Sequence, residues 1–178
     1  AHSVAGLIAE GLPKLRVVNR ATDGARYADI VRQLQADTSR FDAVLVLGGG
    51  NDVIRGTDTS ELTAQVRQAA DLARQIAPVV VMMPPGNVGN APFFWRPVSW
   101  LMDRRSQSLH AAVRRSAQAT GATYVNLYKP RADDPFAQRP KELHARDGLH
   151  PSDAGYALWM QELEQASGLR GKLVAASR

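Results

Sequence analysis

The sequence predicts an α/β domain in which helices cover both faces of a parallel sheet. Short runs rich in β-branched residues alternate with longer stretches of helical periodicity, which is typical of repeated strand–helix units. The chain has 178 residues, enough for one domain with a sizeable core. Hydrophobic residues make up 44% and charged residues 22%, values that are typical of globular proteins and unlike those of disordered chains.

Four short apolar runs are expected to form the strands of this sheet. Each run is bounded by turn-forming residues and is too short to be a helix of ordinary length. The expected strands cover residues 15–19, 42–47, 79–83 and 122–127. Because helical stretches separate the runs, the strands should lie parallel to one another.

Helices are expected between the strands, and the clearest covers residues 58–77. Its apolar side chains recur at steps of three and four residues and mark one helical face: Leu62, Val66, Ala69, Ala73 and Ile76. Asp58, followed three residues later by Glu61, resembles a capping box at the helix start. Further helices are expected before residue 15, over about 25–35, and from about 100 to a stop at Gly121.

A last helix is expected after Pro151, whose fixed φ suits an N-terminal turn. Its apolar stripe follows the helical period: Tyr156, Trp159, Met160 and Leu163. Packing on the sheet explains such a stripe better than a cofactor site does. Residues 1–167 would then form one domain, and residues 168–178 would form a loose, basic tail.

Composition narrows the class of partner. The formal net charge is +5 at pH 7 and the isoelectric point is about 10.0. The 22 Lys and Arg are scattered among 17 acidic residues, so there is no dense basic tract. Specific nucleic-acid binding is therefore not expected, whereas a preference for anionic lipids stays open. No stretch is apolar over the roughly 20 residues that a membrane helix needs.

The sequence holds no cysteine. This excludes disulfides, thiolate metal ligands and a cysteine nucleophile within this segment. The first residues show neither an initiator Met nor a signal-like apolar run, so any targeting segment is expected upstream. Composition therefore does not fix the compartment.

The first motif is a strand that ends in glycines and a polar pair, over residues 44–52 (VLVLGGGND). It brings Asn51 to the carboxyl edge of the sheet, where open α/β sheets form their sites. An uncharged amide that donates hydrogen bonds suits the stabilisation of a transient oxyanion. An Asx-type turn that closes the strand is the alternative explanation.

The second motif is Asp147-Gly148-Leu149-His150-Pro151, just before the last expected helix. An aspartate three residues before a histidine can accept the imidazole Nδ1 proton and leave Nε2 free as a base. The alternative is a helix-start turn with an incidental histidine. A metal site formed by His144, Asp147 and His150 is disfavoured because no second cluster of matching spacing appears.

The third motif is a strand that runs into a turn, over residues 17–25 (VVNRATDGA). Gly24 lies where the next helix opens, and a glycine N–H at such a place can donate to an anion. Turns of this kind are common, so this motif by itself does not identify a site.

Together, in order and spacing from about Leu15 to about Leu163, these three elements resemble the SGNH (GDSL-type) hydrolase family. In that family a glycine follows five residues after an asparagine that ends a strand, which matches Gly24 and Asn19. The family pattern Gly-x-Asn-Asp matches residues 49–52. Its Asp-x-x-His-Pro pattern matches Asp147 to Pro151.

The resemblance implies serine-dependent hydrolysis of carboxylic esters through an acyl-enzyme. His150 would be the base and Asp147 would orient it. Gly24 N–H and the Asn51 side chain would bind the oxyanion. No metal or organic cofactor is implied, and the substrate would be a small-molecule or lipid ester.

The family's Gly-Asp-Ser block, which carries the nucleophile, does not occur in the sequence. The nucleophilic serine is therefore expected upstream of Ala1, and Ser3 is expected to be structural. A flavodoxin-like sheet has the strand order 2-1-3-4-5, so the first, central strand would also be missing from the chain. An upstream segment is expected to supply it, since its absence would leave unpaired strand edges.

One stretch of the sequence, residues 84–97, holds too many prolines and glycines for a helix or strand and is expected to be a loop. Phe93, Phe94 and Trp95 lie in it, and arginines follow. They are candidate substrate-binding residues, as an acyl-binding wall or as an interfacial flap in peripheral contact with a membrane. The alternative is that they cover the sheet. The flap and the basic surface favour a place in the cell envelope.

Two other functions stay open at this point. A non-catalytic ligand-binding module could keep the same fold, and the missing Gly-Asp-Ser block favours it. An acyltransferase would use the same acyl-enzyme with an alcohol in place of water.

Overall fold

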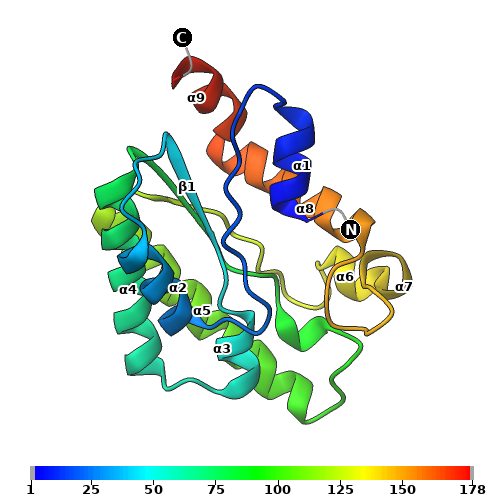
Figure 1. The fold of residues 1–178 in the computed structure, drawn as a ribbon. Coiled ribbons are helices and arrows are strands. Elements are labelled where there is room, and N and C mark those ends of the chain that lie inside the picture. Colours follow the sequence, from blue (N-terminus) through cyan, green and yellow to red (C-terminus); the bar gives the residue numbers. More distant parts are fainter. Residues whose placement is uncertain (1–2, 177–178) are drawn as a thin grey trace.

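Three parallel strands run through the middle of the computed structural model, which describes residues 3–176 (Figure 1). They are β1 (Ala43–Leu47), β2 (Val79–Met83) and β3 (Thr123–Tyr124), in the order β1-β2-β3. Strand β1 pairs with β2 over its whole length, whereas β3 pairs with only two residues of β2. The expected parallel α/β arrangement is thus confirmed.

Helices pack on both sides of the sheet. The longer ones are α1 (Val4–Gly11), α2 (Tyr27–Ala36), α4 (Thr59–Ile76), α5 (Val98–Thr120), α8 (Asp153–Ser167) and α9 (Leu169–Ala176). The short ones are α3 (Gly50–Arg55), the 3₁₀ turn η1 (Val88–Asn90), α6 (Pro135–Gln138) and α7 (Pro140–Leu143). No helix within residues 3–176 is both long and apolar enough to cross a bilayer.

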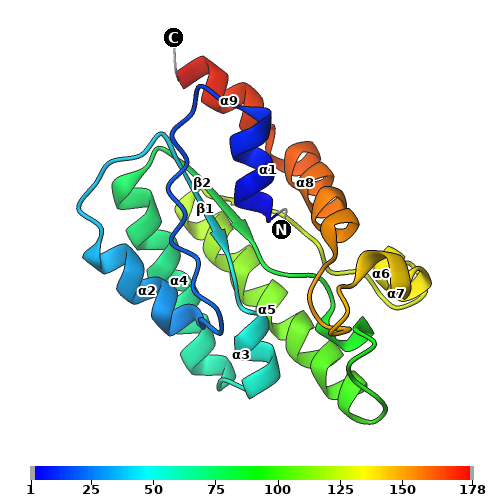
Figure 2. The ribbon, with the colours of Figure 1, turned by 45° about the vertical axis from the view of Figure 1, so that its right-hand side comes forward.

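The side chains of β2 contribute to two hydrophobic cores. Val80 and Met82 point into a cluster with α2, α4 and α5, while Val81 and Met83 point into a second cluster with α1, α8 and α9. Side chains of a strand alternate between its faces, so a strand apolar throughout has to be covered on both. Figure 2 shows the two helical layers on either side of the strands.

The best-defined helix prediction is confirmed. Helix α4 begins directly after Asp58, whose side chain accepts hydrogen bonds from the backbone N–H groups of Ser60 and Glu61 at 2.9 and 3.2 Å. Helix α5 ends, as expected, at Gly121, which has a φ of +71°. A left-handed residue is the usual helix stop, and glycine adopts it without steric cost.

The predicted strand over residues 15–19 is wrong as a paired strand. The segment is extended and runs beside β1 in Figures 1 and 2, but it belongs to no ladder. Within residues 3–176, β1 has a strand partner only on its β2 side. The predicted strand over 122–127 is also shorter than expected, although Val125 N still donates to Met82 O at 3.0 Å.

The prediction of a loose C-terminal tail is wrong for Leu169–Ala176, which form α9. Leu169 is buried against the second core cluster, and Leu173 packs there as well. Because these two leucines are four residues apart, they lie on one face of the helix and pack it on the core. The basic composition of the tail does not indicate this apolar face. Residues 177 and 178 lie outside the described residues.

Candidate active site

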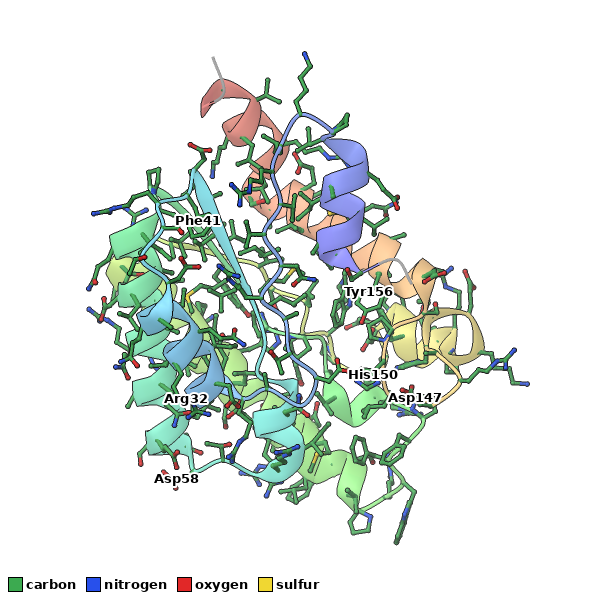
Figure 3. All side chains as sticks on the ribbon, in the orientation of Figure 1. Arg32, Phe41, Asp58, Asp147, His150 and Tyr156 are labelled. Carbon is green, nitrogen blue, oxygen red and sulfur yellow. The ribbon has the colours of Figure 1, made fainter. Side chains whose placement is uncertain are left out.

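The turn at residues 147–150 holds an aspartate and a histidine in direct contact (Figure 3). His150 Nδ1 lies 2.6 Å from Asp147 Oδ2. Asp147 Oδ1 accepts hydrogen bonds from the backbone N–H groups of Leu149 and His150 at 2.9 and 3.0 Å. The hydrogen bond from the His150 side chain and those from the backbone lower the pKa of Asp147 to about 2. An ionised Asp147 accepts a hydrogen bond from Nδ1–H, so in this tautomer Nε2 keeps the lone pair that a general base needs.

Short-range hydrogen bonds shape this turn. Ala145 N donates to His150 O at 2.8 Å, and Gly148 N donates to Ala145 O at 3.0 Å. Gly148 has a φ of +69°, which favours glycine there. Helix α8 begins directly afterwards, because Ser152 Oγ accepts from Gly155 N at 3.1 Å and caps it. His150 is thereby presented just ahead of a helix that packs on the sheet.

Asn51 lies in the first turn of α3, at the carboxyl end of β1. The strand turns sharply into α3 at Gly49, whose φ is +104°. A Cβ on Gly49 would come within 2.6 Å of Leu109 and 3.1 Å of Tyr27, so only glycine fits there. Asn51 Nδ2 donates to Ala25 O at 3.1 Å. An amide nitrogen carries two hydrogens, so one remains for a ligand.

Asp52, next to Asn51, has a role that its place in the motif did not reveal. It is 1% exposed. Its carboxylate accepts from Tyr27 N and from Thr57 Oγ1, both at 2.9 Å. Burial raises the pKa of Asp52. The side chain ties α3 to the start of α2 and so positions Asn51, a function that only the long-range contact with Tyr27 shows.

Gly24 lies in a turn next to Asn51. It has a φ of +74°, and the turn is closed by Ala25 N donating to Thr22 O at 3.2 Å. Ala25 O is the group that accepts from Asn51. Gly24 itself does not line the cavity that Asn51 lines. The structure therefore brings Gly24 beside Asn51 through Ala25.

A cavity of about 270 Å³ connects the two motifs. Both Asn51 and His150 line it, although they lie far apart in the sequence. Its walls are largely apolar and include Leu47, Ile54, Val88, Phe136, Leu149 and Trp159. Tyr156 also lines it, and burial, followed by the charges of Asp147 and Asp23, raises the pKa of Tyr156. The aspartate next to Gly24 therefore lies within electrostatic reach of the same wall.

The loop before α5 closes one side of this cavity and is held by buried polar groups. Its Pro85 carbonyl accepts a hydrogen bond from His110 Nε2 at 2.7 Å, and His110 Nδ1 lies 2.7 Å from Tyr124 Oη. Burial lowers the pKa of His110 to about 4. Asn90 Nδ2 donates to Asp134 Oδ2 at 2.7 Å. None of these buried groups was expected from the sequence.

The aromatic candidates do not join the cavity. Phe93, Phe94 and Trp95 are absent from its lining. Phe93 is 60% and Trp95 74% exposed, whereas Phe94 packs against the first core cluster. Ser3 caps α1, with its Oγ accepting from Gly6 N at 3.2 Å, which is the structural position expected for it.

Within the described part of the chain, no group of three or more His, Asp or Glu side chains is arranged to hold a metal ion. His144 lines the cavity, but its Nδ1 lies 3.3 Å from Pro140 O and its ring packs edge-on against Phe136. The ligand set considered from the sequence, His144 with Asp147 and His150, is thus not assembled.

Comparison with known proteins places the chain in a family. The family model described as GDSL-like lipase/acylhydrolase matches residues 1–158. A curated relative, the GDSL lipase Rv0518 of Mycobacterium tuberculosis (strain ATCC 25618 / H37Rv), is 32% identical over 136 residues. The alignment covers 73% of this chain and 52% of the relative, so the chain spans about half the length of the curated relative it matches.

Solved structures resemble the fold as well. The acetylxylan esterase Axe2 of Geobacillus stearothermophilus is 22% identical, with a TM-score of 0.69 over 94% of this chain and 82% of Axe2. LAE5, an α/β hydrolase from the metagenome of Lake Arreo, Spain, is 22% identical, with a TM-score of 0.75 over 93% of this chain and 81% of LAE5. At this level of identity the likeness concerns the fold alone. Substitutions of a serine and of a histidine in Axe2 are described as catalytic mutants of that enzyme.

Proposed function

The chain belongs to the GDSL-like lipase/acylhydrolase family, and on this premise we propose that the protein hydrolyses carboxylic esters through an acyl-enzyme. The substrate is a small-molecule or lipid ester. The nucleophile is a serine that lies upstream of Ala1. A serine and a histidine are named as catalytic in Axe2, which supports this pairing by analogy.

In the first half of the reaction, the serine hydroxyl attacks the ester carbonyl and His150 Nε2 takes its proton. The proton then passes to the leaving alcohol as the tetrahedral intermediate collapses to the acyl-enzyme. In the second half, water attacks the acyl group, and His150 takes and returns a proton in the same way. Asp147 holds the imidazole in one tautomer and stabilises the imidazolium, which the 2.6 Å contact with His150 supports.

Both tetrahedral intermediates carry a negatively charged oxygen. We assign its stabilisation to the Asn51 side chain and to the Gly24 backbone N–H. Within residues 3–176 the Gly24 N–H makes no hydrogen bond, and Asn51 uses only one of its two amide hydrogens. Two uncharged donors suit an oxyanion that exists only transiently, because they do not bind a resting anion as strongly as a cation would.

A single observation carries this proposal. Asn51 and His150 line one cavity, and His150 is paired there with Asp147. A donor for an oxyanion and an oriented base facing one space are the parts that acyl transfer requires around a reactive hydroxyl.

The upstream segment is also proposed to supply the central strand of the sheet. It would lie between β1 and the extended residues 15–19, neither of which has a strand partner on the facing side among the described residues. The test is amide hydrogen exchange of Ala43–Leu47 in the chain from Ala1 and in a version extended upstream. Slower exchange in the longer version is expected. Equal exchange in the two would contradict the strand assignment.

Labelling with a fluorophosphonate tests the chemistry. The extended protein should take up one label on an upstream serine and should hydrolyse a p-nitrophenyl ester. The His150→Ala variant should lose both properties, because the serine then has no base. An extended protein that binds esters but is neither labelled nor active would identify a ligand-binding module instead.

A further inference from the structure

An exposed apolar corner lies where the loop after η1 leads into α5, at the lower edge of the molecule in Figure 1. We call Phe93, Trp95, Trp100 and Leu101 the aromatic corner. Their exposed fractions are 60%, 74%, 59% and 41%. Within the described residues, four of the seven exposed large hydrophobic side chains thus fall in this one segment. Single exposed hydrophobic residues are ordinary, whereas a cluster marks an interaction site.

Hydrogen bonds and ring packing hold the backbone that carries the aromatic corner. Phe94 N donates to Ala91 O at 3.1 Å, and Ser99 N donates to Trp95 O at 3.0 Å. The Phe94 ring packs inward on the first core cluster and meets the Phe93 ring edge-on, with centroids 5.0 Å apart. The fold therefore holds the loop down through one aromatic ring and leaves its neighbours facing outward.

Guanidinium groups flank the exposed rings. Arg96 and Arg104 are exposed, and the Arg104 guanidinium lies 5.0 Å from the centroid of the Trp100 ring. Asp103 is the acidic residue within residues 91–104, and its carboxylate accepts hydrogen bonds from Asn87 Nδ2, Gln107 Nε2 and Tyr128 Oη. Across residues 3–176, neither arginine forms an ion pair with an aspartate or glutamate. The corner is thus apolar and positively charged at once.

We propose that the aromatic corner docks the protein onto an anionic lipid surface. Indole rings favour the boundary between headgroups and acyl chains, where one end of the ring is apolar and the other is wet. Arginines beside them reach anionic headgroups, each contributing to binding while the salt concentration is low. The charge complementarity selects an anionic membrane over a neutral one and over a second, equally basic copy of this chain.

Docking would also place the candidate active site at the membrane. Phe93 N donates to Gly148 O at 3.1 Å, which joins the loop of the aromatic corner to the turn that carries Asp147 and His150. Ala91, in the same loop, lines the cavity. The docking itself does not depend on the proposed ester hydrolysis, because membrane binding can be measured without turnover.

The test measures co-sedimentation of the purified protein with vesicles. Phosphatidylcholine mixed with phosphatidylglycerol should bind the protein, and phosphatidylcholine alone should not. The double variant Trp95→Ser, Trp100→Ser should bind the mixed vesicles at least about tenfold more weakly, because it loses the apolar surface that inserts. The double variant Arg96→Gln, Arg104→Gln should lose about fivefold in affinity for each charge, and the loss should vanish at high salt.

A matched control removes two charges from α5, the helix that carries Arg104. Arg114 and Arg115 are exposed on α5, away from the aromatic corner. Arg114→Gln with Arg115→Gln should leave vesicle binding unchanged. Unchanged binding by the tryptophan variant, or equal binding to neutral vesicles, would overturn the proposal. So would self-association that the tryptophan substitutions abolish, which would assign the corner to a second copy of the chain.

Discussion

The two halves of the candidate active site are built in opposite ways. The Asp147–His150 half is local and exposed: the side chains are 50% and 67% exposed, and the turn is closed by hydrogen bonds between near neighbours. The Asn51 half is held from a distance, by buried Asp52 and by side chains packed on Gly49. This contrast indicates that function and stability can be separated by mutation on the first side but not on the second.

The largest expected effect is on the exposed half. In the extended protein, His150→Ala should lower kcat for a p-nitrophenyl ester by about 10⁴-fold or more, because the base is lost. The thermal unfolding midpoint should hardly move, since an exposed side chain contributes little to stability. Steady-state kinetics and circular dichroism measure the two. A variant with full activity would remove the base assignment.

The next largest expected effect is the loss of kcat on removal of the Asn51 side-chain amide. Asn51→Ala should lower kcat by about 10²–10³-fold and change KM less, because an oxyanion donor acts mainly in the transition state. Asn19→Ala is the matched control: it removes the same side chain from an exposed turn, where its Oδ1 accepts a hydrogen bond from Ala21 N at 2.9 Å. Equal effects of the two substitutions on kcat would exclude the oxyanion role.

Buried His110, under the loop that borders the cavity, should make stability depend on pH. Its pKa is lowered by burial to about 4, whereas an unfolded histidine titrates near 6.5. Between these values the unfolded state binds the extra proton, so stability falls as the pH falls. The loss should reach about 3 kcal/mol once the pH approaches about 4.

Urea unfolding of the wild type and of His110→Gln, from about pH 7 to about pH 4, isolates this contribution, because other groups titrate in both proteins. The stability difference between the two should shift in favour of the variant as the pH falls. A difference that does not depend on pH would mean that folding leaves the pKa of His110 unchanged.

The smallest expected effects are on the free energy of unfolding, and they differ between the two halves of the site. Asp52→Ala should lower the free energy of unfolding by about 2 kcal/mol, because Tyr27 N and Thr57 Oγ1 lose a buried acceptor. Asp147→Ala should lower it by less than about 1 kcal/mol, since water replaces the carboxylate. Chemical denaturation measures both. Equal losses would show that the exposed half is also a structural support.

The contrast between local and long-range contacts also explains which features the sequence could predict. Helix α4 and the Asp147–His150 turn depend on residues a few positions apart, so spacing alone is enough to predict them. The role of Asp52 depends on Tyr27, which spacing does not connect with it. Residues 15–19 were predicted to be a strand from their apolar run. Among the described residues they have no strand partner, and the neighbour expected for them is the central strand predicted upstream of Ala1. Helix α9 was missed because only Leu169 and Leu173 hold it to the core.

The sequence also leaves open which of the loop aromatic residues packs on the core. The pattern at Phe93, Phe94 and Trp95 indicated apolar surface near the site but not which ring turns inward. In the structure only Phe94 does so, because the loop bends over the core at Ala91 and Phe94. Which side of a proline-rich loop faces the core depends on backbone geometry that its composition leaves undetermined.

Among residues 3–176, β1 has a strand partner on its β2 side alone, which bears on how the chain from Ala1 behaves at high concentration. Unpaired backbone N–H and C=O groups along a straight, apolar strand can pair with another molecule. Natural proteins usually cover such a strand or place charged side chains on it. The β1 sequence Ala-Val-Leu-Val-Leu carries no charge and no proline. In the chain from Ala1 this strand is therefore the expected starting point of aggregation, and the version extended upstream is expected to stay in solution at higher concentration.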